Sequence, residues 1–230
     1  GIFFQKSVPT HEFLISMIPV GTGNDWCRMF QIPFNYSDAI ALIKQNNTFI
    51  QDIGRVSYFN STTLKRRYFI NVAGMGYDAE VASKTNKDKE RGKGGPFSYL
   101  KNLFTSLLFY KYSQTEIIID DLPERYKNQT FSVSVGICKY NGGGMKQLPN
   151  AIPDDGLLDM TLIKKLGKLT VLKEVKNLYD GSFIQHPKVQ TFQGKSFRID
   201  SKPAINLEVD GESLGHSPFT FEVIPACLRI

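Results

Sequence analysis

The chain is poor in the residues that bind metals through side-chain nitrogen or sulfur. Its 230 residues include only three cysteines and three histidines, and their spacing matches no zinc site. An odd number of scattered cysteines favours buried free thiols in a reducing compartment over a disulfide framework. These residues are Cys27, Cys138, Cys227, His11, His186 and His216.

Long apolar runs and common catalytic signatures are also missing. No apolar run reaches the roughly 20 residues that span a bilayer, and residues 1–6 do not have the pattern of a signal peptide. There is no Walker-type Gly-Lys-Ser/Thr loop and no Ser/His/Asp or Cys/His arrangement. Without a basic and aromatic recognition module, we expect no nucleic-acid partner. The formal net charge of +6 is compatible with nucleotide phosphates or acidic lipid headgroups.

Hydrophobic patterning divides the sequence near residue 50. Before it, a strand is expected over residues 13–20, a helix from the following turn to about residue 30, and a second helix over 37–44 with Ser37 as its N-cap. After it, β-branched and aromatic runs predict strands at 52–59, 67–73, 115–120, 130–138, 157–163, 196–200 and 205–209. Helices are expected at 97–112 and 170–179. The predicted architecture is therefore a partial α/β unit followed by an all-β sandwich or barrel with two helical excursions.

A glycine-rich turn follows the first predicted strand. It reads Gly21-Thr22-Gly23-Asn24-Asp25. Strand, glycine turn and helix form the local geometry in which backbone N–H groups can face a phosphate, and Asn24 or Asp25 can cap the helix. Only twenty residues precede this turn, too few for the βαβ layers that usually flank it.

Three further clusters combine acidic residues with glycine. Residues 71–80 suggest a tight turn after a strand. In residues 152–159, adjacent carboxylates before a glycine suit a hard cation such as Mg²⁺, although an ordinary turn explains them as well. In residues 207–213, two carboxylates flank one glycine, which suits a general base or a metal-associated acid but also a plain hairpin turn.

The most charged stretch covers residues 84–95. A solvated loop is the simpler interpretation of this segment. The alternative is a basic loop that touches an anionic surface, with Phe97 and Tyr99 beside it as interfacial aromatics. The sequence does not separate these two interpretations.

Taken in order, these motifs resemble the diacylglycerol kinase catalytic-domain family. The bacterial soluble lipid kinases, related to sphingosine and ceramide kinases, are the most similar branch. The likeness covers essentially the whole chain and rests on five segments in series: Ile18-Pro19-Val20-Gly21-Thr22-Gly23-Asn24-Asp25, Asp52-Ile53-Gly54, Gly76-Tyr77-Asp78-Ala79-Glu80, Asp155-Gly156-Leu157-Leu158-Asp159 and Val209-Asp210-Gly211-Glu212.

The resemblance implies a domain arrangement and a reaction. Residues 1–50 would be a partial nucleotide-binding domain, 51–218 a β-sandwich lipid-kinase domain, and 219–230 a terminal strand returning to the first domain. The implied reaction transfers the γ-phosphoryl group of ATP to a lipid hydroxyl with Mg²⁺, at a cleft between the domains. The implied setting is cytoplasmic and peripheral, at the inner membrane face.

The resemblance also assigns roles to individual residues. Glu212 matches the proton acceptor, with Asp210 as the second choice. The nucleotide-contacting turn and its acidic neighbours match Gly21, Thr22, Gly23, Asn24, Asp25 and Asp52. A metal site matches the Asp155 carboxylate with the backbone carbonyls of Ile152 and Leu157.

The chain departs from the family in one respect. The family's Gly-Gly-Asp-Gly-Thr loop lies some thirty residues before the Gly-Thr-Gly-Asn-Asp turn, and nothing before Gly21 contains it. We therefore expect these 230 residues alone to be an N-terminally truncated kinase that does not turn over ATP. An incomplete parallel sheet exposes an edge, which favours association into a homo-oligomer. The alternatives are a non-catalytic lipid- or nucleotide-binding module that uses the same cleft and, ranked lower, a kinase of the NAD kinase type. The identity of the lipid cannot be read from the sequence.

Overall fold

In the residues that the structure describes, two N-terminal helices are followed by ten strands with helices inserted between them. The computed structural model describes residues 10, 13–21, 23–93 and 96–230, and their side chains except those of 96–100. Its helices are α2 (Asp25–Met29), α3 (Tyr36–Lys44), α4 (Tyr77–Glu90), α5 (Pro96–Phe109), α6 (Lys168–Glu174), α7 (Asn177–Asp180) and the 3-10 helix η2 (Ser182–Gln185). Its strands are β1 (Ile50–Asn60), β2 (Thr63–Phe69), β3 (Val72–Gly76), β4 (Ser113–Ile119), β5 (Arg125–Gly136), β6 (Leu158–Lys164), β7 (Val189–Gly194), β8 (Ser196–Lys202), β9 (Asn206–Val209) and β10 (Glu212–Arg229).

The strands form a sandwich because two long strands, β5 and β10, each take part in both layers. One layer runs β2-β1-β10-β8-β4-β5, and the other runs β7-β6-β5-β3-β9-β10, with antiparallel pairing throughout. In β5, residues 125–130 pair with β4, and residues 132–136 pair with β3. A bulge between Thr130 and Ser132 lies at the change of partner. A bulge bends a strand, which allows one strand to turn the corner between layers.

The space between the layers is filled by apolar side chains from alternating strand positions. In β8 and β4 every second residue is buried, as expected for strands with one face on a core. The largest fully buried side chains include Phe69, Phe197, Phe219, Phe221 and Met75. Burying each such side chain contributes about 1.5–3 kcal/mol, so this core is the main source of the sandwich's stability.

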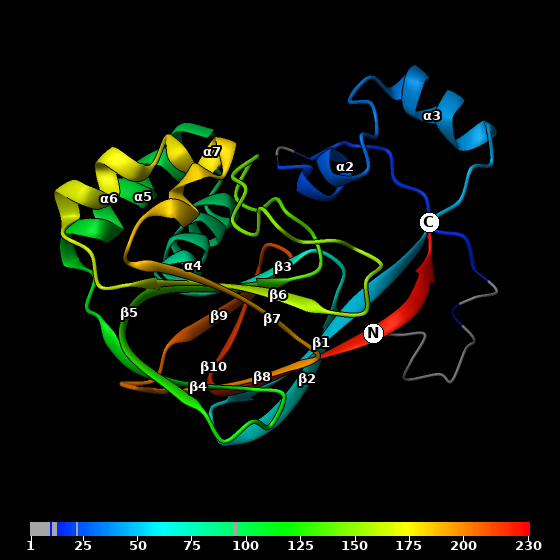
Figure 1. Cartoon of the computed structure of the whole chain (residues 1–230). Coiled ribbons are helices and arrows are strands. Elements are labelled where there is room, and N and C mark those ends of the chain that lie inside the picture. Colours follow the sequence, from blue (N-terminus) through cyan, green and yellow to red (C-terminus); the bar gives the residue numbers. More distant parts are fainter. Residues whose placement is uncertain (1–9, 11–12, 22, 94–95) are drawn as a thin grey trace.

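The helices lie in two separate groups around the sandwich. Helices α4, α5, α6 and α7 cover one face together, whereas α2 and α3 lie at the other end, near the C-terminus of β10 (Figure 1). A second apolar cluster joins the first group to β5. It contains Tyr77, Val81, Leu103, Leu107, Phe131, Leu166 and Val171. The site described below involves loops between these two groups.

Most of the expected elements are confirmed. The fold class, partial α/β followed by a β-sandwich, agrees with the structure. The helix expected over 97–112 is α5, and the one expected over 170–179 is the pair α6 and α7. The proposed domain boundaries remain a prediction. Strand β10 is continuous across the proposed boundary between residues 218 and 219. Its end contacts the N-terminal segment through a parallel bridge between Leu14 and Arg229.

Several expectations about local structure are wrong. Residues 13–20 form no strand beyond that single bridge, since β10 supplies only one partner position and Pro19 has no N–H to donate. The strand expected over 67–73 is two strands, because the N–H groups of Ile70 and Asn71 bond the Asp210 carboxylate rather than a neighbouring strand. Strand β7 was not predicted.

Capping of α3 also differs from the expectation. Asn35, rather than Ser37, caps the helix, since its side-chain oxygen accepts bonds from the backbone N–H groups of Ser37 and Asp38. Asparagine is as favourable as serine at this position, so composition alone does not decide between them.

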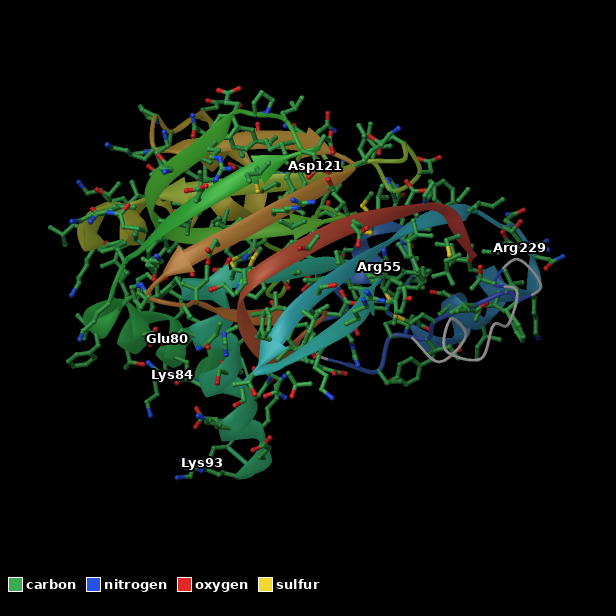
Figure 2. All side chains as sticks on the ribbon, turned by 90° about the horizontal axis from the view of Figure 1, so that it is seen from below. Arg55, Glu80, Lys84, Lys93, Asp121 and Arg229 are labelled. Atoms are coloured by element: carbon green, nitrogen blue, oxygen red, sulfur yellow. The ribbon has the colours of Figure 1, made fainter. Side chains whose placement is uncertain are left out.

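The basic segment over 84–95 is not a loop throughout. Residues up to Glu90 belong to α4, because Tyr77, Val81 and Thr85 recur at helical spacing and are buried against the sandwich. Lys84 bonds Glu80 one turn earlier at 2.8 Å, and Lys93 lies beyond the helix end (Figure 2). Among the helices that the structure describes, none is long and apolar enough to cross a membrane.

Candidate active site

The turn between β9 and β10 carries the two residues that the sequence favours as proton acceptors. Asp210 and Gly211 have φ values of 49° and 88°, the left-handed pair of a tight two-residue hairpin. The Asp210 carboxylate accepts hydrogen bonds from the backbone N–H groups of Ile70, Asn71 and Val72 at 3.0–3.2 Å. Burial raises its pKa to about 6, although these three donors oppose the increase. Asp210 thus fastens the hairpin to the β2–β3 connection.

Glu212 begins β10 directly after this turn, and its side chain reaches solvent. Its carboxylate forms an ion pair with Arg67 of β2 at 2.7 Å, and its side chain is 61% exposed. Exposure leaves this carboxylate accessible to a substrate, whereas the Asp210 carboxylate is occupied by three backbone donors. The geometry is compatible with the proton-acceptor role, which remains a prediction.

Two side chains fix the position of Gly211 between these acids. The Asn86 side-chain amide, on α4, donates to the Gly211 carbonyl oxygen at 3.0 Å and also lies 3.2 Å from the Ser213 hydroxyl. On the other side, the Glu208 carboxylate accepts from the Gly211 N–H. Burial raises the pKa of Glu208 to about 8, and the negative charges of Asp210 and Asp78 add to the effect.

Asp25 of the glycine-rich turn contacts a second glycine loop that sequence reasoning missed. Its carboxylate accepts from the backbone N–H groups of Gly143 and Gly144 at 2.8 and 2.6 Å, and it pairs with Arg28 at 3.5 Å. Burial is the main influence on Asp25 and raises its pKa. Gly142, Gly143 and Gly144 all have positive φ, so the run of three glycines was a readable signal for a special loop.

The rest of the first turn borders an open hollow. The Asn24 side chain donates to the Gly21 carbonyl oxygen at 2.6 Å and closes the turn. Gly21 and Asn24 line a hollow of about 590 Å³ together with residues 35–37 at the start of α3. Gly23 lies between them, and Thr22 is outside the described residues. Asn24 is the N-cap of α2 by position, but its side chain makes no capping bond.

Asp52 supports the loop that was predicted to bind a metal. It is buried, and its two carboxylate oxygens accept from the Gly156 and Ala226 N–H groups, each at 2.7 Å. Its own N–H donates to the Pro153 carbonyl at 2.8 Å. Asp52 therefore attaches residues 153–156 to the end of β10.

The predicted metal ligands lie in this loop. The Asp155 carboxylate accepts from the Leu157 N–H at 3.0 Å, while Ile152 is exposed one turn earlier. Asp159 follows in β6, and its pKa is raised to about 6, first by burial and also by the charge of Asp155. Carboxylate and carbonyl oxygens are the ligands that a hard cation prefers. The described part of the chain contains no group of three or more His, Cys, Asp or Glu side chains that could hold a metal ion, so a metal here would need carbonyl and water ligands.

Hydrogen bonds connect these separate loops. The Trp26 indole N–H donates to the Gln51 side-chain oxygen at 2.9 Å, and the Gln51 amide donates to the Ile70 carbonyl at 2.6 Å. Ile70 in turn donates to Asp210. These hydrogen bonds link α2, the start of β1 and the β9–β10 hairpin. Asp52, next to Gln51, extends the link to the loop over residues 153–156.

A small apolar cavity lies between the sheet and the helices α4, α5 and α6. Its volume is about 50 Å³. Its polar end is formed by Asp78, Ser134, Gln147 and Thr161. The Asp78 carboxylate accepts from the Ser132 hydroxyl at 2.7 Å, and the Ser134 hydroxyl donates to Gln147 at 2.9 Å. Burial raises the pKa of Asp78 to about 6. The remaining lining is mostly apolar and comes from the helices α4 to α7, η2, the sheet and the loops between them: Tyr77, Val81, Leu103, Phe131, Met145, Ile163, Val171, Val175, Leu178 and Phe183.

The antiparallel β-sandwich with glycine turns and carboxylates at its loops defines the structural class of the chain. Residues 71–230 match the family model described as "YegS C-terminal NAD kinase beta sandwich-like domain". The chain belongs to the diacylglycerol kinase and YegS-like lipid kinase family.

Individual relatives agree with this assignment. The chain is 31% identical over 222 residues to a diacylglycerol kinase of Staphylococcus epidermidis, covering 96% of this chain and 65% of that protein. It is 30% identical over 234 residues to a "Probable lipid kinase YegS-like" protein of Shewanella frigidimarina, covering 98% and 69%. The chain thus spans about two thirds of the length of these curated relatives.

A solved structure shows the same fold. The crystal structure described as a diacylglycerol kinase from Bacillus anthracis superposes with a TM-score of 0.66 at 22% identity. The match covers 94% of this chain and 65% of that one. At this identity the likeness supports the fold alone.

Proposed function

We propose that this chain is the greater part of an ATP- and Mg²⁺-dependent kinase that phosphorylates a lipid hydroxyl of the diacylglycerol type. The observation that carries the proposal is the β9–β10 hairpin. It presents Glu212 to solvent while Asp210, Asn86 and Glu208 fix the turn beside it. Phosphoryl transfer requires alignment and neutralisation of charge more than covalent chemistry, so a rigidly placed base is a central requirement.

In the proposed reaction, the Glu212 carboxylate accepts the proton of the lipid hydroxyl as its oxygen attacks the γ-phosphorus of ATP. The bond from the γ-phosphorus to the bridging oxygen breaks, and ADP leaves with the electron pair. Asp155 with the carbonyls of Ile152 and Leu157 would hold Mg²⁺, which neutralises phosphate charge when bound. Gly21 and Asn24 of the first turn border the hollow in which the nucleotide would lie.

The cavity beneath α4, α5 and α6 supports a lipid as the acceptor. Its lining is mostly apolar. Helix α4 lines the cavity and also contacts the hairpin, because its Asn86 side chain donates to the Gly211 carbonyl oxygen. We propose that it receives part of an acyl chain while the hydroxyl reaches Glu212. Since its present volume is about 50 Å³, a longer section of chain requires α5 and α6 to move apart. A lipid substrate and the exposed apolar helices described below agree with a peripheral location at the inner membrane face, which is part of the proposal.

The second candidate function is a lipid- or nucleotide-binding module that uses the same cleft but does not catalyse phosphate transfer. The sequence expectation that these 230 residues alone do not turn over ATP remains a prediction. A thermal shift by ADP that requires Mg²⁺ supports a kinase cleft, whereas a shift by dispersed diacylglycerol alone supports the binding module. Turnover is tested in a fusion, called here the completed kinase. It joins the part of the Staphylococcus epidermidis relative that this chain does not match to these residues. Transfer of phosphate from ATP to diacylglycerol supports the proposal, and nucleotide binding without transfer to any lipid hydroxyl overturns it.

A further inference from the structure

The outer faces of α5 and α6 expose a group of large apolar side chains. We call it the α5–α6 patch, and its members are Phe104, Leu108, Phe109, Leu169 and Leu172. Phe109 is 80% exposed, Leu169 75% and Leu108 60%, values that stand out for residues of this size. The Lys168 ammonium group donates to the Leu108 carbonyl oxygen and joins the two helices. Figure 1 shows α5 and α6 next to each other at the end of the molecule away from α3.

The segments that carry the patch are basic. Residues 96–115 contain Lys101 and Lys111 and no acidic residue. Residues 165–179 contain four lysines and a single acid, Glu174, whose carboxylate accepts from the Asn177 side chain at 2.7 Å. The lysines of the second segment are Lys165, Lys168, Lys173 and Lys176. These six lysines are exposed, and exposed apolar side chains on segments rich in lysine are typical of surfaces that lie in the interface of an anionic bilayer.

The patch also lies directly outside the apolar cavity. Leu103 of α5 and Val171 of α6 line the cavity, while their sequence neighbours Phe104 and Leu172 point to solvent. A bilayer in contact with the outer faces would therefore meet the two helices that separate the cavity from solvent.

We propose that the α5–α6 patch docks the protein on anionic bilayers, with its apolar side chains inserted among the acyl chains and its lysines at the headgroups. This replaces the segment over 84–95 as the proposed membrane contact, since much of that segment is helix α4 and Lys84 is paired with Glu80. The proposal uses the proposed lipid kinase activity only to explain what docking is for, because binding to vesicles needs neither ATP nor turnover.

The test is sedimentation of the 230-residue chain with vesicles of equimolar phosphatidylglycerol and phosphatidylcholine, compared with pure phosphatidylcholine. We expect binding to the anionic vesicles that weakens with added salt. The double substitution Leu108→Glu with Leu169→Glu should lower the partition coefficient by at least about tenfold. The matched control is Leu64→Glu with Leu122→Glu, which alters two similarly exposed leucines on β2 and after β4 and should leave binding unchanged.

A charge variant keeps the test informative if the apolar variant misfolds. Lys111→Gln with Lys173→Gln leaves the apolar residues in place and should lower binding to anionic vesicles about tenfold. Equal binding by the wild type and both patch variants overturns the proposal. A second result would also overturn it: the Leu108 and Leu169 variant binds vesicles as the wild type does, but light scattering without vesicles shows that it no longer self-associates. That result assigns the patch to a second copy of the chain. Neither outcome bears on phosphate transfer by the completed kinase.

Discussion

Asn86, near the end of α4, donates its side-chain amide to the carbonyl oxygen of Gly211, 3.0 Å away. One helix thus touches both the hairpin that carries Glu212 and, through Tyr77 and Val81, the apolar cavity. The contact gives a physical link between the place proposed for the lipid chain and the place proposed for proton transfer.

Removing this hydrogen bond should slow phosphate transfer. A single hydrogen bond contributes about 1 kcal/mol, so Asn86→Ala should lower kcat of the completed kinase about fivefold by loosening the hairpin. Lys87→Ala changes the next residue on the same helix, which is exposed, and serves as the control. Equal kcat values for wild type, Asn86→Ala and Lys87→Ala would show that the hairpin keeps its position without Asn86.

Glu208 should make the chain less stable as the pH rises. Its pKa is about 8 in the folded protein against a usual value of 4.5, so the folded state retains a proton that the unfolded state loses. The free energy of unfolding must therefore fall as pH rises through this window. Asp78 and Asp210, both near 6, act in the same direction at lower pH.

The substitution Glu208→Gln isolates this contribution. It keeps an oxygen that accepts from the Gly211 N–H but removes the titration, so the decline above about pH 6 should become shallower. Urea unfolding at a series of pH values measures the difference. A variant with the same pH dependence as the wild type would show that Glu208 is already ionised in the folded chain.

Asp155 should account for stabilisation by magnesium. Asp155→Asn removes the one exposed carboxylate of the proposed ligand set and should abolish the increase in Tm caused by Mg²⁺. The Tm without metal should change little, because the bond to the Leu157 N–H can be kept by the amide oxygen. Asp154→Asn, one residue earlier and also exposed, is the control and should keep the Mg²⁺ effect. The reverse pattern would place the metal elsewhere in the loop.

The cavity can be filled without touching the nucleotide side of the site. Val171→Phe places a larger side chain in a space of about 50 Å³, and we expect KM for diacylglycerol to rise severalfold while KM for ATP stays constant. Leu64→Phe enlarges an exposed leucine on β2, outside both the cavity and the α5–α6 patch, and should change neither value. If a folded Val171→Phe variant has an unchanged KM for diacylglycerol, the cavity does not bind the acyl chain.

The sequence predicts the strands best where local pattern and burial agree. In β4 and β8 alternation matches the buried face, and the predicted ranges lie within a few residues of the observed strands. Local pattern fails where a distant side chain decides the backbone's partners. The Asp210 carboxylate interrupts the predicted strand over 67–73 from nearly 140 residues away in sequence.

The candidate site likewise combines features that local sequence predicts with features that depend on tertiary contacts. The hairpin at Asp210 and Gly211 is readable from the dipeptide, whereas the bonds from Asn86 and Glu208 to Gly211 depend on how α4 and β9 pack. The glycine run beginning at Gly142 was visible as a sequence, but its partner Asp25 was not, because only the fold brings them together. Residue types therefore suggest the chemistry, while tertiary contacts decide which groups are available for it.

Replacement of Glu212 in the completed kinase tests the central claim most directly. We expect Glu212→Gln to lower the rate of phosphate transfer from ATP to diacylglycerol by at least about a hundredfold while ATP still binds, since a general base contributes that much or more. The matched control is Glu222→Gln, because Glu222 lies on the same strand and is also paired with an arginine, Arg55 at 2.8 Å. A control with the wild-type rate and an inactive Glu212→Gln are the results that the account predicts. A Glu212→Gln variant that phosphorylates lipid as fast as Glu222→Gln would contradict it.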